Sequence, residues 1–403
     1  MSADLPLSGV KVLDLAWVVA GPAIARSLAD YGATVVHVES RTRVDPTRLM
    51  GPFPQGKSDV ERSALFDTAN AGKLGLALDL GRPESQEIVR DLVRWADLVV
   101  ESFAPGQLAR WGLAPEALRA LNPSIVGLST CLMGQSGPLS PVAGFGNIGA
   151  SVAGFQNIVG WPGALPVGPF GPYTDFVAPR FGIFTVLAAL DHRRLTGEGC
   201  WLDLSQGEAG IQFLGAEIAE GAATGRYAAA NGNRDPQFAP HGVFRARGDD
   251  DWVAIVARND AEWRTLAHEI GGAAEAAAFA TLEGRKAEED HLEAVIAAWT
   301  SDKDAHDIER RLQGLGVPAH KASSGPDVIA DPQMEIFGHF VRLSHATGEE
   351  SLFESSRYRL SDTPAVYRRP APPYGRDNRT VLAEILGYES ARIDQLEASG
   401  ALT

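Results

Sequence analysis

The chain has 403 residues, 45% of them hydrophobic and 22% charged, which is the balance of a folded globular protein rather than a disordered one. Its formal net charge of −15 argues against nucleic acid and anionic membranes as partners, and we expect no membrane span because no uninterrupted apolar run approaches roughly 18 residues. Two cysteines, scattered histidines and an N-terminus without a secretory signal pattern predict a cytoplasmic protein with no disulfide framework and no metal site.

The first 130 residues alternate between short apolar runs and amphipathic stretches. This alternation predicts an α/β fold with a parallel, Rossmann-like sheet and right-handed crossovers. The turn between Leu15 and Gly21 lacks the GxGxxG pattern, which argues against a nicotinamide dinucleotide at that turn. The expected strands cover residues 10–15, 34–38, 74–80, 98–101 and 125–128, and the expected helices cover residues 20–31, 83–95 and 115–121.

Residues 131–178 interrupt the alternation and are rich in glycine and proline. A connection of this length in a compact domain is usually functional or disordered, and its many aromatic side chains argue against disorder. It leads into an apolar helix expected over 179–194, a strand over 201–204 and a small-residue helix over 206–225.

The composition changes again at residues 227–240, where we place a domain linker. Beyond it, the turn residues at 247–251 predict a hairpin, and helical patterns follow. The expected helices lie near 260–270, 286–299, 303–314 and 379–386, with a polar segment of short strands over 338–369.

Several short motifs follow one another along almost the whole chain. They are Gly9-Val-Lys-Val-Leu-Asp-Leu15, Ala20-Gly-Pro22, Asn70-Ala-Gly-Lys73, Glu101-Ser-Phe-Ala-Pro-Gly106, Gly134-Gln-Ser-Gly-Pro138, Ala239-Pro-His-Gly-Val-Phe244 and Ala371-Pro-Pro-Tyr-Gly-Arg-Asp-Asn378. No single motif is specific, but their order and spacing resemble the family III CoA-transferases. That superfamily includes formyl-CoA transferase, carnitine CoA-transferase and α-methylacyl-CoA racemase.

The resemblance implies a domain arrangement that the strand pattern alone does not show. Both ends of the chain would build one large α/β domain, first over 1–225 and again over 326–403. A smaller α+β domain would be inserted over 226–325, and two copies of the chain would form an interlocked homodimer. The implied partners are an acyl-CoA and small carboxylic acids, with CoA as substrate and product and no tightly bound cofactor.

Asp175 is the residue that matches the catalytic aspartate of the family. In the implied reaction it attacks an acyl-CoA thioester, forms an aspartyl–acyl anhydride and then an aspartyl-CoA thioester. A carboxylate suits this role because it can act as nucleophile, acyl carrier and leaving group. The local sequence alone also fits a helix N-cap before the apolar run at 179.

Six residues match positions that surround CoA in the family. A lysine or arginine can hold phosphate, and a phenylalanine can stack on adenine. A serine stands at the position of the family's usual asparagine, and a glutamate at a strand end is where ribose is bound in dinucleotide folds. These residues are Glu39, Arg41, Lys73, Ser102, Phe103 and Arg110.

Five side chains are expected to line the pocket for the acid: Trp17, Val18, Val19, Phe145 and Trp161. Val18 and Val19 stand where formyl-CoA transferase has a glutamine, which predicts a more apolar pocket for a bulky or aromatic acid. Phe145 stands where the racemase branch has a histidine, and inversion by proton transfer needs two acid–base groups. A racemase or isomerase, and a partner subunit of a hetero-oligomeric transferase, remain the alternatives to a CoA-transferase.

Overall fold

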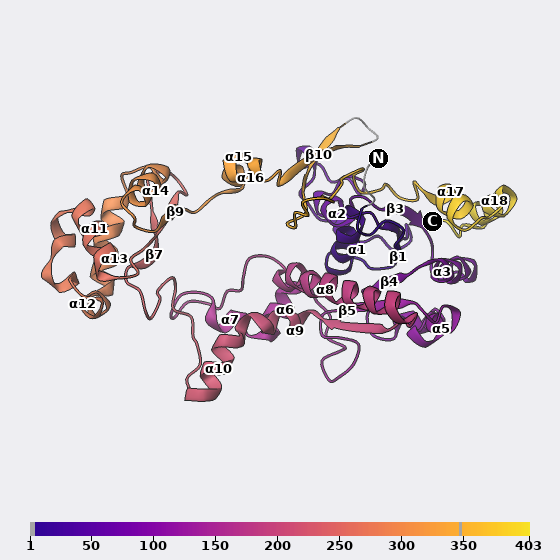
Figure 1. The fold of residues 1–403 in the computed structure, drawn as a ribbon, viewed down its shortest axis with the longest axis horizontal. Helices are drawn as coiled ribbons and strands as arrows, with labels where there is room; N and C mark the ends of the chain where they lie inside the picture. The colour runs from indigo at the N-terminus through magenta and orange to yellow at the C-terminus, as the bar shows by residue number, and fades with distance from the viewer. Residues whose placement is uncertain (1–4, 346–348) are drawn as a thin grey trace. The chain divides into compact units, whose positions relative to one another are not determined.

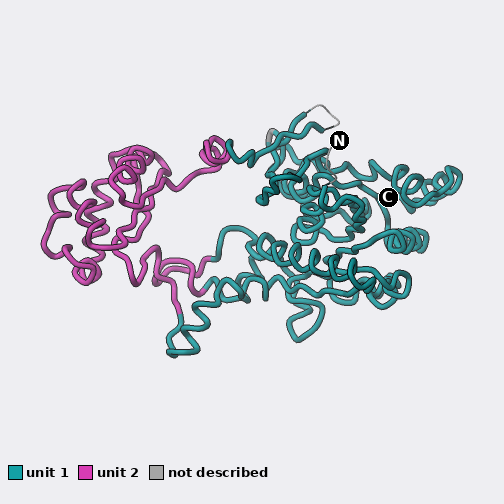
Figure 2. The backbone as a smooth tube through the Cα atoms, viewed as in Figure 1, with its two compact units in different colours: residues 1–156, 168–227, 335–403 teal, residues 157–167, 228–334 magenta. Residues whose placement is uncertain are grey.

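The computed structural model describes residues 5–345 and 349–403. The chain forms two compact units, which Figure 2 shows in different colours. Unit 1 comprises residues 1–156, 168–227 and 335–403, so both ends of the chain contribute to it, and unit 2 comprises residues 157–167 and 228–334. The segment 157–167, which the sequence assigned to the large domain, therefore belongs with unit 2.

Unit 1 is built on a parallel sheet of six strands, in the order β3-β2-β1-β4-β5-β6. The predicted α/β fold class with a parallel sheet is confirmed. Strands β2 and β3 are added on one side of β1, and β4 to β6 are added on its other side. The strand order therefore changes direction between β1 and β4, which are hydrogen-bonded neighbours. The strands are β1 Lys11–Asp14, β2 Thr34–Glu39, β3 Leu74–Ala77, β4 Leu98–Glu101, β5 Val126–Cys131 and β6 Trp201–Ser205 (Figure 1).

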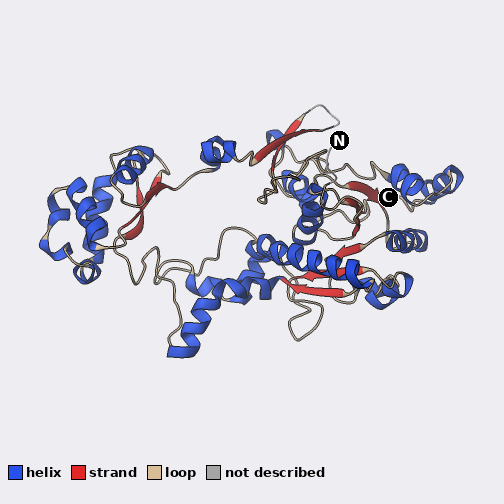
Figure 3. Cartoon of the chain, in the orientation of Figure 1, coloured by secondary structure: helices blue, strands red, loops and turns tan. Residues whose placement is uncertain are grey.

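Helices cover both faces of this sheet (Figure 3). Alternate residues of β1 point to opposite faces, so Val12 joins the core under α1 (Ala20–Asp30) and α8 (Tyr173–Thr196), whereas Leu13 joins the core under α3 (Pro83–Trp95). Helix α8 lies close to α1 because Gly182 has no side chain: a Cβ there would come within 2.3 Å of Ile24 Cδ1. This close packing holds the middle of α8 against α1.

The remaining helical segments of unit 1 connect these elements. They are α2 Ala64–Asn70, α4 Gln107–Arg110, α5 Pro115–Leu121, α6 Gly146–Ala153, α7 Phe155–Ile158, α9 Gln206–Ile211, α10 Gly215–Thr224, α17 Asn378–Thr380 and α18 Ser390–Ser399. A hairpin of β10 Phe340–Ser344 and β11 Glu350–Glu354 precedes α17. Helix α18 packs into the same core as α3, which brings the C-terminal segment back onto the first strands.

One predicted helix was started too late, and two others are present in a different form from the one expected. Helix α8 begins at Tyr173 rather than at 179 and runs through Pro179, whose missing N–H leaves the Asp175 carbonyl without its helical partner. The expected helix over 206–225 is divided by a 3₁₀ turn at Gln212–Leu214. The expected last helix at 379–386 is a π-helical turn at Val381–Ile385, and α18 beyond it was not predicted.

Unit 2 is an α+β unit around an antiparallel sheet of three strands, in the order β7-β8-β9. The strands are β7 His241–Arg245, β8 Trp252–Val256 and β9 Ala319–Lys321, and the helices are α11 Asp260–Ile270, α12 Leu282–Ala287, α13 Glu289–Thr300, α14 Ala305–Gly314 and α15 Gly325–Ala330. Short helix α16, Pro332–Ile336, lies at the return to unit 1. The expected hairpin at 247–251 is the β7–β8 connection.

Helix α8 meets the length and hydropathy criteria for a membrane helix, with 24 residues and a mean hydropathy of 1.2 in its most apolar window. Part of that window is packed within unit 1, because Ile183, Val186 and Ala189 join the core under the sheet. The same length and hydropathy occur in core helices of globular domains, so this helix is weak evidence for a membrane span.

Candidate active site

A cavity of about 470 Å³ opens in unit 1 at the carboxyl ends of β4 and β5. In open parallel sheets this edge, beside the point where the strand order changes direction, is where ligands usually bind. Its walls come from the turn after β1, the segments after β4 and β5, and the start of α8. Its lining residues include Trp17, Val18, Ser102, Thr130, Phe145, Asp175 and Gln206.

Asp175 lies in the first turn of α8, and its side chain is buried but lines this cavity. It does not cap its own helix, whose N-cap is Pro172. Instead Asp175 Oδ2 accepts a hydrogen bond of 3.0 Å from the N–H of Gly146, the first residue of α6. A side chain on residue 146 would prevent this approach, since a Cβ there would lie 2.4 Å from the Pro172 oxygen.

Burial changes the acidity of the Asp175 carboxyl group. Burial raises the pKa of Asp175 to about 6, although the hydrogen bonds from Gly146 and from the Gln206 side chain act in the opposite direction. The carboxylate is therefore ionised at neutral pH yet poorly solvated. A desolvated anion at the wall of a cavity is a competent nucleophile toward a carbonyl carbon.

A second cavity of about 550 Å³ lies on the other side of the same turn. Trp17, Val18 and Ser102 line both cavities, so these residues form the boundary between them. Phe103 lines the second cavity, where its ring meets Trp17 and Trp111 edge to face at centroid distances of 5.9 and 5.0 Å. The structure thus brings Ser102 and Phe103 together at one site.

The model of CoA-transferase family III matches residues 7–378 of this sequence. This chain belongs to CoA-transferase family III.

Named relatives of this CoA-transferase cover nearly the full chain. The succinate–glutarate CoA-transferase of Agrobacterium fabrum is 32% identical over 94% of this chain and 96% of its own length. The succinyl-CoA–D-citramalate CoA-transferase of Chloroflexus aurantiacus is 31% identical over 98% and 97%. A crystal structure of a CaiB/BaiF family protein from Brucella suis has a TM-score of 0.87 at 29% identity, covering 95% of this chain and 100% of that protein.

Lys73 does not occupy the place that the family resemblance implied. Its ammonium group is fully buried and lines neither cavity. Lys73 Nζ donates to Asp14 Oδ2 at 2.7 Å, to Asn70 Oδ1 at 2.7 Å and to the Pro22 carbonyl at 2.8 Å. These contacts use all three of its protons, so the expected contact with a CoA phosphate does not fit this structure.

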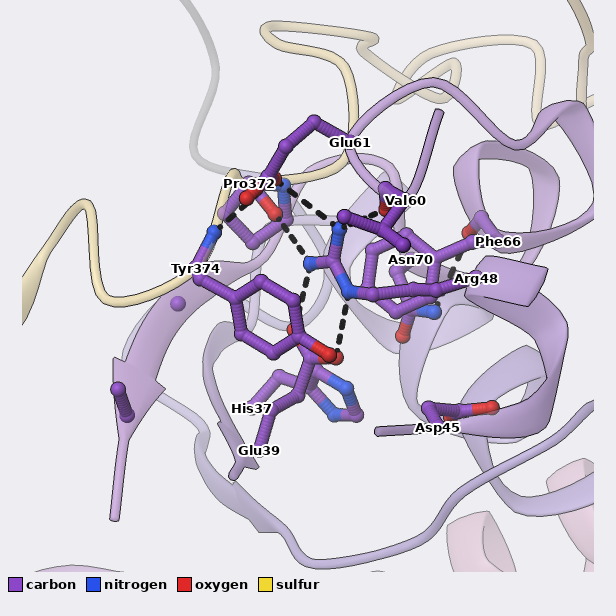
Figure 4. Close-up of polar contacts among 12 residues, drawn as sticks. His37, Glu39, Asp45, Arg48, Val60, Glu61, Phe66, Asn70, Pro372 and Tyr374 are labelled. Atoms are coloured by element: carbon purple, nitrogen blue, oxygen red, sulfur yellow. Dashed lines mark hydrogen bonds and ion pairs between the residues drawn. The ribbon is translucent and has the colours of Figure 1, made fainter. Parts of the chain in front are cut away.

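Glu39 also has a different partner from the one expected. Its two carboxylate oxygens accept from Arg48 Nε and Nη2, both at 2.7 Å (Figure 4). The Arg48 guanidinium lies between the rings of Phe66 and Tyr374, at 3.6 and 4.1 Å from their centroids. Glu39 contributes to the wall of the second cavity, but its oxygens hold Arg48 and are not free for a ribose.

Four other expected site residues lie outside the two cavities. Arg41 and Arg110 are exposed and line neither one, and Val19 lines a smaller cavity beside Arg26 and Asp30. Trp161 belongs to unit 2, where it lines a cavity with Trp252. Phe145, by contrast, lines the Asp175 cavity.

The candidate site includes residues that the sequence predictions did not name. Gln206 is buried, follows directly on β6 and lines the Asp175 cavity. Arg43 lines the second cavity of this CoA-transferase. Their position just after predicted strands was the available signal, because the carboxyl ends of parallel strands meet at one edge.

Proposed function

We propose that this protein transfers CoA from an acyl-CoA to a free carboxylic acid through covalent intermediates on Asp175. One observation carries the proposal: a buried carboxylate with a raised pKa faces a cavity at the switch point of a parallel sheet. Among the described residues, no lysine or arginine makes an ion pair with Asp175, so its charge is available for reaction rather than neutralised.

The transfer begins when an Asp175 oxygen attacks the thioester carbonyl carbon. The tetrahedral oxyanion collapses, the C–S bond breaks and CoA leaves as a thiolate, which gives the aspartyl–acyl anhydride. The thiolate then attacks the Asp175 carbonyl carbon, the anhydride C–O bond breaks, and the first acid leaves as a carboxylate. The second acid repeats these steps in reverse on the aspartyl-CoA thioester, which restores Asp175.

The surroundings of Asp175 support this chemistry. The N–H of Gly146 already donates to its carboxylate at the N-terminus of α6, where the helix dipole favours negative charge. Such a donor is available to stabilise an oxyanion that forms on the Asp175 carbonyl. The Gln206 side chain, which also hydrogen-bonds to Asp175, supplies a second polar group in the same cavity.

We place the nucleotide of CoA in the second cavity and its thioester arm across the shared boundary. Phe103 offers a ring face for adenine, and Arg43 offers a guanidinium for phosphate. The arm would pass Trp17, Val18 and Ser102 to bring the thioester to Asp175. This placement retains Phe103 and Ser102 from the family resemblance and replaces Lys73 by Arg43.

The acid pocket favours a substrate with an apolar tail. Trp17, Val18, Leu132, Val142 and Phe145 surround the space in front of Asp175. The relatives named above use succinate, glutarate and citramalate, so a range of acids is compatible with this fold. Rates with short aliphatic, aromatic and dicarboxylic acids, measured against several acyl-CoA donors, will identify the class.

We also propose a homodimer, interlocked as the family resemblance implies. Large apolar side chains are exposed along α8 and the following helices, including Phe184 at 75% and Phe213 at 54%. Large apolar side chains exposed in this number often mark a protein interface. Light scattering after size exclusion tests this, with a monomer at micromolar concentration as the contradicting result.

A labelling experiment tests the proposed activity. Incubation of an acyl-CoA with a ¹³C-labelled acid is expected to give labelled acyl-CoA and the unlabelled acid in equal amounts. Solvent deuterium at the α-carbon without an acid acceptor would instead indicate a racemase. Activity that appears only after a second, different chain is added would indicate a partner subunit.

A further inference from the structure

The turn that separates the two cavities is held at three consecutive backbone positions. Each N–H donates to a side chain: Ala16 to Asp14 Oδ1 at 3.0 Å, Trp17 to Ser102 Oγ at 2.9 Å, and Val18 to Asp45 Oδ2 at 3.0 Å. Regular secondary structure would satisfy such groups with backbone carbonyls. Here three side chains from different segments fix the turn.

Val18 has an unusual backbone conformation for its residue type. Its φ is 70°, and among the residues that the structure describes it is the one non-glycine residue with a positive φ. A β-branched side chain is strained in this left-handed region, and such strain persists only where surrounding contacts enforce it. Because Val18 lines both cavities, its backbone conformation affects the shape of the boundary between them.

Asp45 is the contact that enforces it. Its side chain is fully buried, and its other oxygen accepts from the Thr47 N–H at 2.8 Å and from Thr47 Oγ1 at 2.7 Å. The next residues are fixed in turn, because Arg48 is held by Glu39. Asp45 therefore joins the Val18 turn to a rigid segment of the chain.

The same segment forms one wall of the second cavity. Thr42, Arg43, Val44 and Pro46, on either side of Asp45, all line it. A ligand in this cavity would therefore contact the loop that carries Asp45. The hydrogen bond from Val18 is the direct connection between that loop and the reaction cavity.

We propose that Asp45 is a positioning residue, which holds Val18 in its left-handed conformation and so couples occupation of the nucleotide cavity to the geometry beside Asp175. The proposal rests on the proposed function, since it concerns how CoA and the reacting carboxylate are aligned. Asp45 touches neither reacting group, and it acts through the Val18 backbone.

The test uses the substitutions Asp45→Asn, Val18→Gly and Val18→Ala in the full-length protein. Asparagine replaces one carboxylate oxygen of Asp45 by an NH₂ group, which then faces either the N–H of Val18 or the two donors of Thr47. Two donors cannot hydrogen-bond to each other, so kcat/KM for an acyl-CoA is expected to fall about tenfold. Glycine adopts a positive φ without strain. The double variant V18G/D45N is therefore expected to recover most of the loss, and V18A/D45N is not.

A second readout separates positioning from general loss of structure. The same acyl group on N-acetylcysteamine lacks the nucleotide of CoA, so the native protein should prefer the acyl-CoA strongly. D45N is expected to reduce this preference. Thr47→Val, which removes a hydroxyl from the other oxygen of Asp45, is the matched control and should leave the preference unchanged.

Full activity of D45N, an unchanged preference, or equal recovery by V18G and V18A would each overturn the proposal. If D45N does not fold, a folded and active V18G/D45N supports the proposal, whereas a double variant that is slow or does not fold contradicts it. Failure of the proposed function looks different, because Asp175→Ala would then retain transfer whatever the Asp45 variants do.

Discussion

Two buried aspartates in unit 1, Asp14 and Asp175, have pKa values shifted in opposite directions. Burial alone would raise the pKa of Asp14, but Lys73 and His37 outweigh it and lower the pKa to about 2. Burial raises the pKa of Asp175 to about 6, and only uncharged donors oppose it. Burial therefore does not by itself mark a reactive carboxylate. The partners decide whether a buried charge stabilises the fold or is available for chemistry.

The largest expected effect is on activity at Asp175. Asp175→Asn and Asp175→Ala remove the nucleophilic oxygen, so the transfer rate should fall by roughly a thousandfold or more. Steady-state rates with a mass-spectrometric readout of the CoA products measure this loss. Asp191→Asn, at an exposed pair with Arg194 on the same helix, is the control and should keep the native rate. A loss of less than tenfold in both Asp175 variants would show that Asp175 is not the reactive one of the two buried aspartates.

The next effect is on stability at Asp14. Asp14→Asn leaves the buried Lys73 ammonium without its ion-pair partner, so unfolding free energy should fall by about 3–5 kcal/mol at pH 7.5. Because the folded pKa is depressed, this contribution is present above the ordinary value of 3.8 and is lost as pH falls through about 2. Urea unfolding measures it. A change below about 1 kcal/mol, as expected for an exposed pair, would contradict a stabilising role for the Asp14–Lys73 ion pair.

Substitution at Asp175 should have the opposite sign for stability. Its folded pKa is raised from 3.8 to about 6, so the native state loses stability as pH rises through that range. Asp175→Asn removes this cost, and the variant should be about 1–3 kcal/mol more stable than the native protein at pH 7.5. At pH 4, just above the ordinary value of 3.8, the difference should shrink to roughly 0.5 kcal/mol. An asparagine variant that is less stable at pH 7.5 would mean that Asp175 also has a structural partner.

The smallest effect concerns the arginines near the second cavity. Arg43→Ala should raise KM for an acyl-CoA about tenfold, which corresponds to one charge-assisted hydrogen bond from an exposed arginine at the rim of the cavity. Arg110→Ala and Arg41→Ala, at exposed positions outside the cavity, should change KM no more than about threefold. Initial-rate measurements at fixed ionic strength distinguish the three. A larger effect at Arg110 would move the proposed phosphate contact to that residue.

The sequence was informative where function depends on position along a strand–helix unit. The parallel sheet followed from alternating patterns, whereas Asp175 was named as the candidate nucleophile from the family resemblance, because its place before an apolar helix also fits an N-cap. Its neighbour Gly146 was not recognised, because close approach of α6 and α8 depends on tertiary packing. Helix α8 was started too late because Pro179 looks like a helix start, whereas here the helix tolerates it.

The sequence was misleading where a charged residue has a distant or unexpected partner. Lys73 was expected to contact a CoA phosphate, but Asp14, 59 residues away, pairs with it in the core. Glu39 looked free, but Arg48 takes both of its oxygens. No pattern predicts the positive φ of Val18, since valine favours extended backbone, and the side chains that hold this turn come from three distant or buried positions, Asp14, Ser102 and Asp45.

The most direct test of the central claim is to trap the intermediate on Asp175. Incubation with an acyl-CoA in the absence of an acceptor acid should build up the aspartyl-CoA thioester. Borohydride reduction or hydroxylamine capture, followed by peptide mass mapping, should then place the modification at Asp175 and nowhere else. An unmodified Asp175 in protein that is turning over, or a modification that persists in Asp175→Ala, would contradict a covalent transfer through this residue.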